Sequence, residues 1–172
     1  MSGRTGREQR ASAAPRVQLP LLDRLIDDAP DEPRDPPLSA AEAMGLLRRA
    51  VRRDLEALLN ARRRWNSWDP GLAELRSSPV GFGMPDFTSG AFNDKGQRDR
   101  LCAEIEETIR RFEPRFVSVR VSLTEENQDQ LDPTLRLRIQ ALLHAEPAPE
   151  PVAFDTVVDP TTSDIVVRQH DT

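Results

Sequence analysis

Apolar residues recur with two different periods on the two sides of Pro114. Before the proline they are three or four residues apart, which places them on one face of a helix: Leu101, Ile105, Ile109 and Phe112. After it they alternate with polar residues, as in a strand with one buried face: Val117, Val119, Val121 and Leu123. Because proline disfavours the helical conformation in the residue before it, the pattern predicts a helix that ends near Phe112 and a strand over 116–123.

A second helix is predicted earlier in the chain. Ser39-Ala40-Ala41-Glu42 has the sequence of a capping box, in which the serine and the glutamate bond each other's backbone N–H groups. The apolar residues that follow share one helical face: Met44, Leu47, Val51, Leu55, Leu58 and Leu59. Between the two helices, residues 65–94 combine turn formers with aromatic residues, which is typical of a loop laid against the core or used for binding.

Three further strands are predicted after residue 123. Alternation of apolar and polar residues over Leu135–Leu143 indicates a half-buried strand. We expect the prolines at 147, 149 and 151 to interrupt the chain before two short strands, 152–158 and 165–168, which a hairpin loop joins. Helices followed by strands predict an α+β domain, with two main helices packed on a small antiparallel sheet of about four strands.

The N-terminal part of the chain differs from this domain. Residues 1–37 are predicted to be a disordered or extended arm and residues 38–172 the domain, because residues 29–37 contain four prolines, which favour an extended linker. Within the arm, segment 19–28 is amphipathic, with apolar residues at helical spacing: Leu21, Leu22, Leu25 and Ile26. The segment is too short to be a stable helix alone. It either packs back on the domain or docks on a partner as an apolar anchor.

Composition and charge limit the classes of function that the chain can have. The chain has 172 residues, of which 37% are hydrophobic and 15 are proline, which indicates one domain with tails. A net charge of −5 argues against non-specific DNA binding. The first predicted helix carries arginines that continue into Arg62-Arg63-Arg64: Arg48, Arg49, Arg52 and Arg53. This stripe is interpreted as a solvated face or, in an adaptor, as a surface for an acidic protein partner.

The residues give no support for metal, cofactor or catalytic chemistry. His144 and His170 lack ligand neighbours at metal spacing, and no nucleophile elbow, phosphate loop or dinucleotide fingerprint occurs. Cys102 adjoins the apolar face of its helix and is interpreted as a packed thiol. No signal peptide and no apolar run of roughly 18 residues is found, which favours a cytoplasmic protein.

Glu113-Pro114-Arg115 lies where the helical pattern changes to the strand pattern. In extended chain, residues i and i+2 point to the same side, so Glu113 and Arg115 are expected side by side. The pair is either an ordinary solvated one or a pre-organised one that is available to a partner. Arg115 is expected to lower the pKa of Glu113, which argues against a general acid of the glycosidase type.

Three motifs together resemble the TssE family, the type VI secretion baseplate subunit related to the gene-25 wedge protein of contractile-tailed phages. They are residues 21–28 (Leu-Leu-Asp-Arg-Leu-Ile-Asp-Asp), Gly83-Met84-Pro85-Asp86-Phe87 and Phe112-Glu113-Pro114-Arg115-Phe116. The resemblance covers roughly residues 19–170. Family members usually have Tyr-Gly-Leu-Pro-Asp where this chain has Phe82-Gly83-Met84-Pro85-Asp86.

The resemblance implies a structural, non-enzymatic role in a baseplate wedge from which the contractile sheath starts to polymerise. Implied partners are wedge subunits of the TssF, TssG and TssK types and sheath subunits of the TssB and TssC types. The Glu-Pro-Arg motif, implicated in assembly within the family, maps onto Glu113, Pro114 and Arg115. The phage relatives have carried a lysozyme-like label, so a peptidoglycan hydrolase is the alternative. A small sheet with short terminal strands is also able to accept strands from a neighbour.

Overall fold

The computed structural model describes residues 17, 19–26, 30–31, 38–65, 67–85, 94–124, 134–146, 148–159, 162 and 164–170. Its elements are α1 (Leu21–Leu25), α2 (Ala40–Asn60), the 3-10 turns η1 (Ala73–Ser77) and η2 (Pro79–Gly81), α3 (Lys95–Phe112), β1 (Phe116–Leu123), β2 (Leu135–Leu143), β3 (Glu150–Val158) and β4 (Ile165–Gln169). The predictions for residues 1–16, for most of linker 29–37 and for Asp86 and Phe87 lie outside the described residues.

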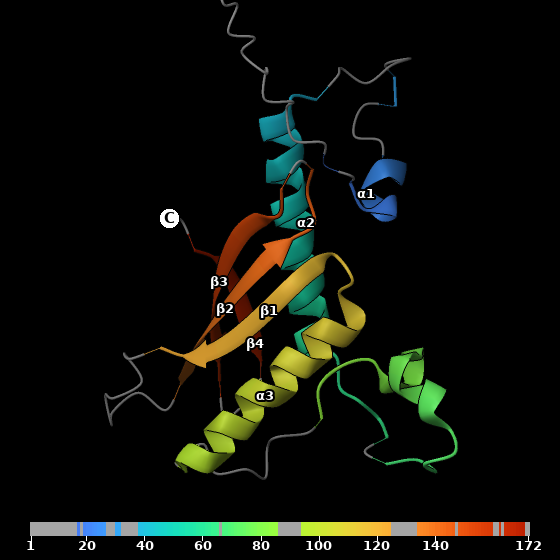
Figure 1. Ribbon diagram of the computed structural model, residues 1–172, viewed down its shortest axis with the longest axis vertical. Helices are drawn as coiled ribbons and strands as arrows, with labels where there is room; N and C mark the ends of the chain where they lie inside the picture. The colour runs from blue at the N-terminus through green and yellow to red at the C-terminus, as the bar shows by residue number, and fades with distance from the viewer. Residues whose placement is uncertain are drawn as a thin grey trace, which may run out of the picture.

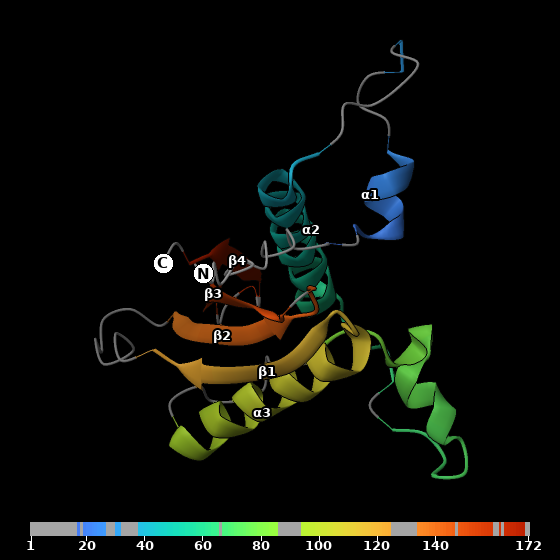
Figure 2. The same ribbon diagram turned by 45° about the horizontal axis from the view of Figure 1, so that its top comes forward.

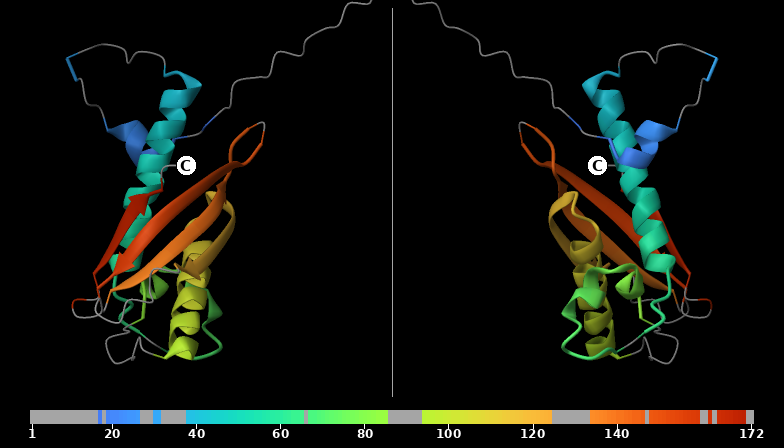
Figure 3. Two further views of the ribbon diagram at one scale, coloured as in Figure 1. Left: turned by 90° about the vertical axis from the view of Figure 1, so that its left-hand side faces the viewer. Right: turned by 90° about the vertical axis from the view of Figure 1, so that its right-hand side faces the viewer.

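The four strands form one antiparallel sheet in the order β1-β2-β3-β4, each strand pairing with the next along the chain (Figure 1). α2 packs chiefly on β4 and α3 on β1 (Figure 2). Seen from two opposite sides, the strands run obliquely to α2 (Figure 3). The α+β prediction is confirmed.

One hydrophobic core lies between the helices and one face of the sheet. The residues predicted for the apolar face of α2 are all buried in it, as are Leu101, Ile105 and Ile109 of α3. The odd-numbered residues of β2 are buried, as its alternation predicted. At the start of α2, the side chains of Ser39 and Glu42 form the predicted capping box.

Two predictions about the strands are wrong. Val117 was expected on the buried face but is 47% exposed, because the register shifts between Phe116 and Ser118. β3 begins at Glu150, so it contains Pro151, which was expected to interrupt the chain. Pro151 pairs with Leu142 of β2, and the part of β3 that pairs with β4 begins only at Phe154. A proline is tolerated there because its missing N–H faces no neighbouring strand among the described residues.

The β4 edge of the sheet is bonded by side chains of α2. Asn60 accepts a hydrogen bond from the N–H of Ile165 at 2.9 Å through Oδ1 and donates to its carbonyl at 2.8 Å through Nδ2. One turn earlier, Glu56 accepts from the N–H of Val167 at 3.3 Å. These bonds occupy the outward groups that a further strand would use.

The β1 edge is bonded in the same way by α3. Glu106 accepts from the N–H of Val121 at 3.1 Å, and Arg110 donates to the carbonyl of Val119 at 3.5 Å. A strand from a neighbour would have to displace these side chains, so the short terminal strands are less available for strand addition than the sequence suggested.

Gly83 fixes the loop between the helices against the end of α2. Its φ is +98°, in the left-handed region. The next residue, Met84, is buried; its N–H bonds the carbonyl of Ala61 at 2.8 Å, and its carbonyl accepts from Arg63 at 2.8 Å. Residues 83–84 are therefore laid against the core, one of the two arrangements expected for the loop.

We expect Gly83→Ala to lower the free energy of unfolding by at least about 1–2 kcal/mol, because alanine is strained at this φ. Its Cβ would also lie 2.4 Å from the carbonyl oxygen of Ala61. The matched control is Gly45→Ala inside α2, where the nearest atom is 3.5 Å away. That change should stabilise by about 0.5–1 kcal/mol. Urea unfolding of both variants measures the difference, and equal effects would contradict the assignment.

Candidate functional site

α1 presents its apolar side chains to solvent. Leu21, Leu22, Leu25 and Ile26 are between 52% and 74% exposed, and no residue of the helix is buried. The helix also lacks a side-chain cap at its N-terminus. Its position beside α2 therefore depends on contacts other than burial of its leucines.

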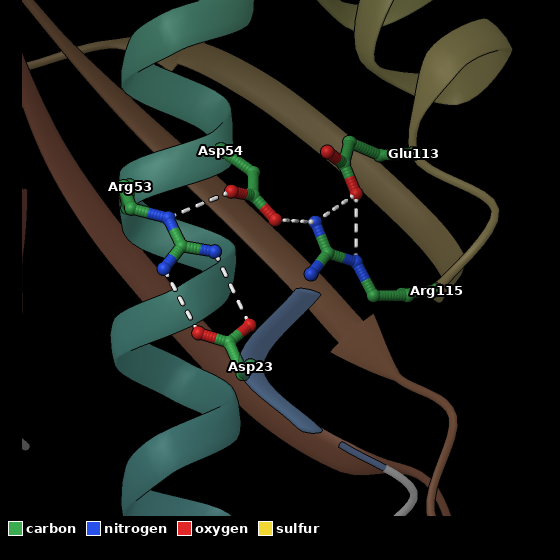
Figure 4. A network of polar contacts seen from close by, with 5 residues as sticks. All are labelled: Asp23, Arg53, Asp54, Glu113 and Arg115. Carbon is green, nitrogen blue, oxygen red and sulfur yellow. Dashed lines mark hydrogen bonds and ion pairs between the residues drawn. The ribbon is translucent and has the colours of Figure 1, made fainter. Parts of the chain in front are cut away.

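Asp23 supplies such a contact. Its two carboxylate oxygens accept from Nη1 and Nη2 of Arg53 on α2, at 2.8 and 3.2 Å (Figure 4). The hydrogen bond from Arg53 holds the pKa of Asp23 below its usual value, and the same bond raises the pKa of Arg53. Two parallel bonds between planar groups fix orientation as well as distance.

Glu113 and Arg115 pair within the chain at the corner between α3 and β1. α3 ends at Phe112, as predicted, and the N–H of Phe116 bonds the carbonyl of Glu113 at 3.2 Å to close a turn over Pro114. Nε and Nη2 of Arg115 both donate to Oε2 of Glu113, at 2.9 and 2.5 Å. The Glu113 side chain is only 9% exposed and that of Arg115 23%. The interpretation of this pair as a solvated one is therefore wrong.

Asp54 of α2 joins this corner to the attachment of α1. Its Oδ2 lies 2.9 Å from Nη2 of Arg115, and its Oδ1 accepts from Nε of Arg53 at 3.0 Å. Three acids and two arginines thus form one network of alternating charge, from Asp23 through Arg53, Asp54 and Arg115 to Glu113 (Figure 4). We call these five residues the charge network. It connects α1, α2, the end of α3 and the start of β1.

The expected lowering of the pKa of Glu113 is also wrong. Burial raises the pKa of this carboxyl above its usual value. The hydrogen bond and charge of Arg115 act in the opposite direction, as expected, while the negative charge of Asp54 adds to the effect of burial. The desolvation of a carboxylate in the core outweighs its single cationic partner.

The interpretation of the arginine stripe as a solvated face holds in part: Arg49, Arg62 and Arg64 are exposed, whereas the other four arginines are partly buried and pair with acids of the chain. Arg48 pairs with Glu150 at 2.6 Å, and Arg63 pairs with Glu104 at 2.8 Å. Arg52 pairs with Glu56, and Arg53 belongs to the charge network. These internal pairs remove most of the support for an adaptor that binds acidic partners through the stripe.

A cavity of about 910 Å³ separates the N-terminal arm from the corner. Its lining is mainly apolar and includes both parts: Val17, Leu19, Pro20, Arg24, Leu47, Pro114, Arg115, His144, Ala145 and Glu146. Pro114 and Arg115 therefore face the arm, whereas Glu113 is not part of the lining. Two motifs that are about ninety residues apart in sequence lie on one surface of the molecule.

The other candidate residues, among those that the structure describes, do not form a network comparable to the charge network. Cys102 is buried, as predicted, and burial raises the pKa of its thiol. Nδ1 of His170 lies 2.6 Å from Asp155, which also pairs with Arg138. In the described part of the chain no three His, Cys, Asp or Glu side chains gather as a metal site would require, and no helix is long and apolar enough to cross a membrane.

Sequence reasoning missed Asp23, Arg53 and Asp54 as parts of this site. Asp23 is the one acid between Leu21 and Ile26, and Asp54 follows directly on the arginines of α2. Each is an acid for which a basic partner could have been expected from its neighbours in the sequence. No spacing rule, however, connects residues 23, 54 and 113.

An exposed apolar helix, attached through charged side chains to an α+β body, is typical of a subunit that works by contacting other proteins. A family model described as baseplate wedge protein gp25 matches residues 46–148. The chain therefore belongs to the family of baseplate wedge protein gp25, a family of structural baseplate proteins. The match contains Gly83 and the Glu113–Arg115 corner but not α1 or the last two strands. No curated protein and no solved structure matches the chain.

We expect Arg115→Ala to lower the free energy of unfolding by about 3 kcal/mol at pH 8, because it leaves the Glu113 carboxylate buried without its donor. The loss should be smaller at pH 5. Burial already raises the pKa of Glu113 above its usual value, and removal of Arg115, which acts in the opposite direction, should raise it further. The folded state then keeps a proton that the unfolded state releases, so stability falls as pH rises through this window.

Chemical denaturation at both pH values measures this effect. In the double variant Glu113→Gln with Arg115→Ala the Glu113 carboxyl is absent, so the pH-dependent part of the destabilisation should disappear between pH 5 and pH 8. An equal loss for Arg115→Ala at the two pH values would show that Glu113 is not the group left uncompensated.

Proposed function

We propose that this protein is a TssE-type structural subunit of a type VI secretion baseplate wedge that works in the cytoplasm. It would connect wedge subunits of the TssF, TssG and TssK types and serve as a starting point for a sheath of TssB- and TssC-type subunits. Membership of the baseplate wedge protein gp25 family supports the wedge role. The order of the three motifs along the chain supports the more specific assignment.

The observation that carries the proposal is the apolar surface of α1, made by Leu21, Leu22, Leu25 and Ile26. Contiguous apolar side chains on the surface mark interaction sites more often than isolated ones do. We propose that a wedge partner accepts this helix in an apolar groove, with the four side chains as anchors. The domain does not use them for its own core.

The Glu-Pro-Arg corner has a different part in this proposal. Pro114 is exposed and Arg115 lines the cavity beside the arm, while Glu113 lies behind them. Glu113 would thus act on assembly indirectly, by holding the Arg115 side chain in place. A partner that covered the cavity would meet Pro114, Arg115 and the arm together.

The alternative, a lysozyme-like peptidoglycan hydrolase, rests on the raised pKa of Glu113, a property that a glycosidase acid needs. Against it, the carboxylate is bonded to Arg115 and does not line the neighbouring cavity. Clearing of purified peptidoglycan by the intact protein separates the two functions. We expect no clearing, and activity lost in Glu113→Gln would favour the hydrolase.

Replacement of Leu21, Leu22, Leu25 and Ile26 by serine should abolish co-purification with the other wedge subunits and the formation of fluorescent sheaths in cells. Because these side chains are exposed, the melting temperature should change by no more than about 1–2 °C. Val166→Ser, an exposed apolar residue of β4, is the matched control and should leave assembly intact. Normal sheaths in the α1 variant would overturn the proposal, and a large fall in melting temperature would show that α1 belongs to the core.

A further inference from the structure

Arg53 and Asp54 form the only described link in the charge network between α1 and the Glu113–Arg115 corner. Arg53 contacts the acid of α1, and Asp54 contacts the arginine of the corner. The two are neighbours on α2 and are bonded to each other through Nε of Arg53 and Oδ1 of Asp54 at 3.0 Å. From the sequence, Arg53 was singled out only as a member of the arginine stripe, and Asp54 belonged to no motif.

α1 has few other means of keeping its position. It has five residues, no side-chain N-cap and no buried side chain, so it is far below the length at which a helix is stable alone. Apolar contact with the body comes from the chain before it, where Val17 packs on the core and Leu19 and Pro20 line the cavity. The pair between Asp23 and Arg53 is thus the contact that sets the orientation of the helix itself.

The central acid makes the two ends of the network interdependent. Asp54 contacts Arg53 through one carboxylate oxygen and Arg115 through the other. A movement of either arginine therefore changes the position of the acid that also holds the other. The charge of Arg115 reaches Asp23 as well and contributes to its lowered pKa. Groups that share a partner in one polar network show non-additive energies when they are changed.

We infer that Arg53 and Asp54 are positioning residues that couple the orientation of α1 to the Glu113–Arg115 corner, so that the apolar helix and the corner form one preassembled surface for a wedge partner. The part of this inference that assigns a wedge partner to the surface rests on the proposed function. The coupling itself is a property of the isolated chain. Preassembly lowers the cost of ordering the arm when the partner binds.

The decisive variant is Asp54→Asn, which keeps the shape of the side chain and removes the charge between the two arginines. Asp54 has no bond to α1 or to Glu113 among the described residues, so its effect on α1 has to pass through the two arginines that it contacts, Arg53 by a direct bond to α1 and Arg115 by its charge. Asp155→Asn is the matched control, because Asp155 pairs with Arg138 and His170 outside the charge network.

The readout is the distance distribution between nitroxide labels placed at Leu25→Cys on α1 and Val117→Cys on β1, measured by pulsed electron spin resonance. Both positions are exposed, and the native Cys102 is buried and does not compete for the label. The parent and Asp155→Asn should give one narrow distribution. Asp54→Asn should raise the share of distances outside that peak about fivefold, a change typical of coupled network residues.

Arg53→Gln provides a second arm if Asp54→Asn does not fold, as judged by its thermal melt. It removes the other half of the link and should broaden the distribution at least as much. An unchanged distribution in both variants, or a broad one in the parent, would overturn the inference. Since no partner is present, these outcomes leave the docking of the α1 leucines to be judged by its own assembly test.

Discussion

The Arg115 guanidinium is the contact on which the junction of α2, α3 and β1 depends. The Glu113 carboxylate, at the end of α3, lies almost out of solvent, where a charge without a partner would be strongly destabilising. Arg115 reaches it because Pro114 makes the chain turn directly after the helix, and the same guanidinium extends to Asp54 on α2. One planar fork thereby joins α2 to the end of α3 and the start of β1, which a lysine, with a single charged nitrogen, would not do as well.

At the two sheet edges, apolar burial and hydrogen bonds have different roles. Burial of apolar residues brings α2 and α3 onto the sheet, but burial alone would allow each helix to slide or rotate. Asn60 and Glu56 on one edge and Glu106 on the other bond specific backbone N–H groups, which fixes each helix to one register. Because unpaired strand edges invite pairing with other chains, these bonds also limit unwanted association of a protein whose family works in a large assembly.

Much of the fold follows from local patterns, and most of the site does not. Helix and strand spacing, the Ser39 capping box and the stop before Pro114 all depend on interactions between residues close in sequence, and these predictions held. Val117 was misplaced because a register shift is set by pairing with β2. The ion pairs of Arg48 and Arg63 were not predicted because their acidic partners, Glu150 and Glu104, lie on other elements. The direction of the pKa of Glu113 depended on its burial, which two neighbouring residues do not reveal. The charge network draws on positions 23, 53, 54, 113 and 115, so only the tertiary fold brings it together.

An ion pair, and not burial of leucines, attaches α1 to α2, and this affects how strongly α1 can bind a partner. Full burial of a leucine or isoleucine side chain contributes about 1.5–3 kcal/mol, and this contribution is available to a partner only if the domain has not already used it. A flexible arm would keep its leucines free but would lose affinity to the cost of ordering several residues on binding. The pair between Asp23 and Arg53 avoids both losses, because it orders the helix during folding and leaves its apolar face uncovered. It does so through a half-exposed arginine, whose bond to α1 is weak enough for the helix to adjust as a partner closes over it.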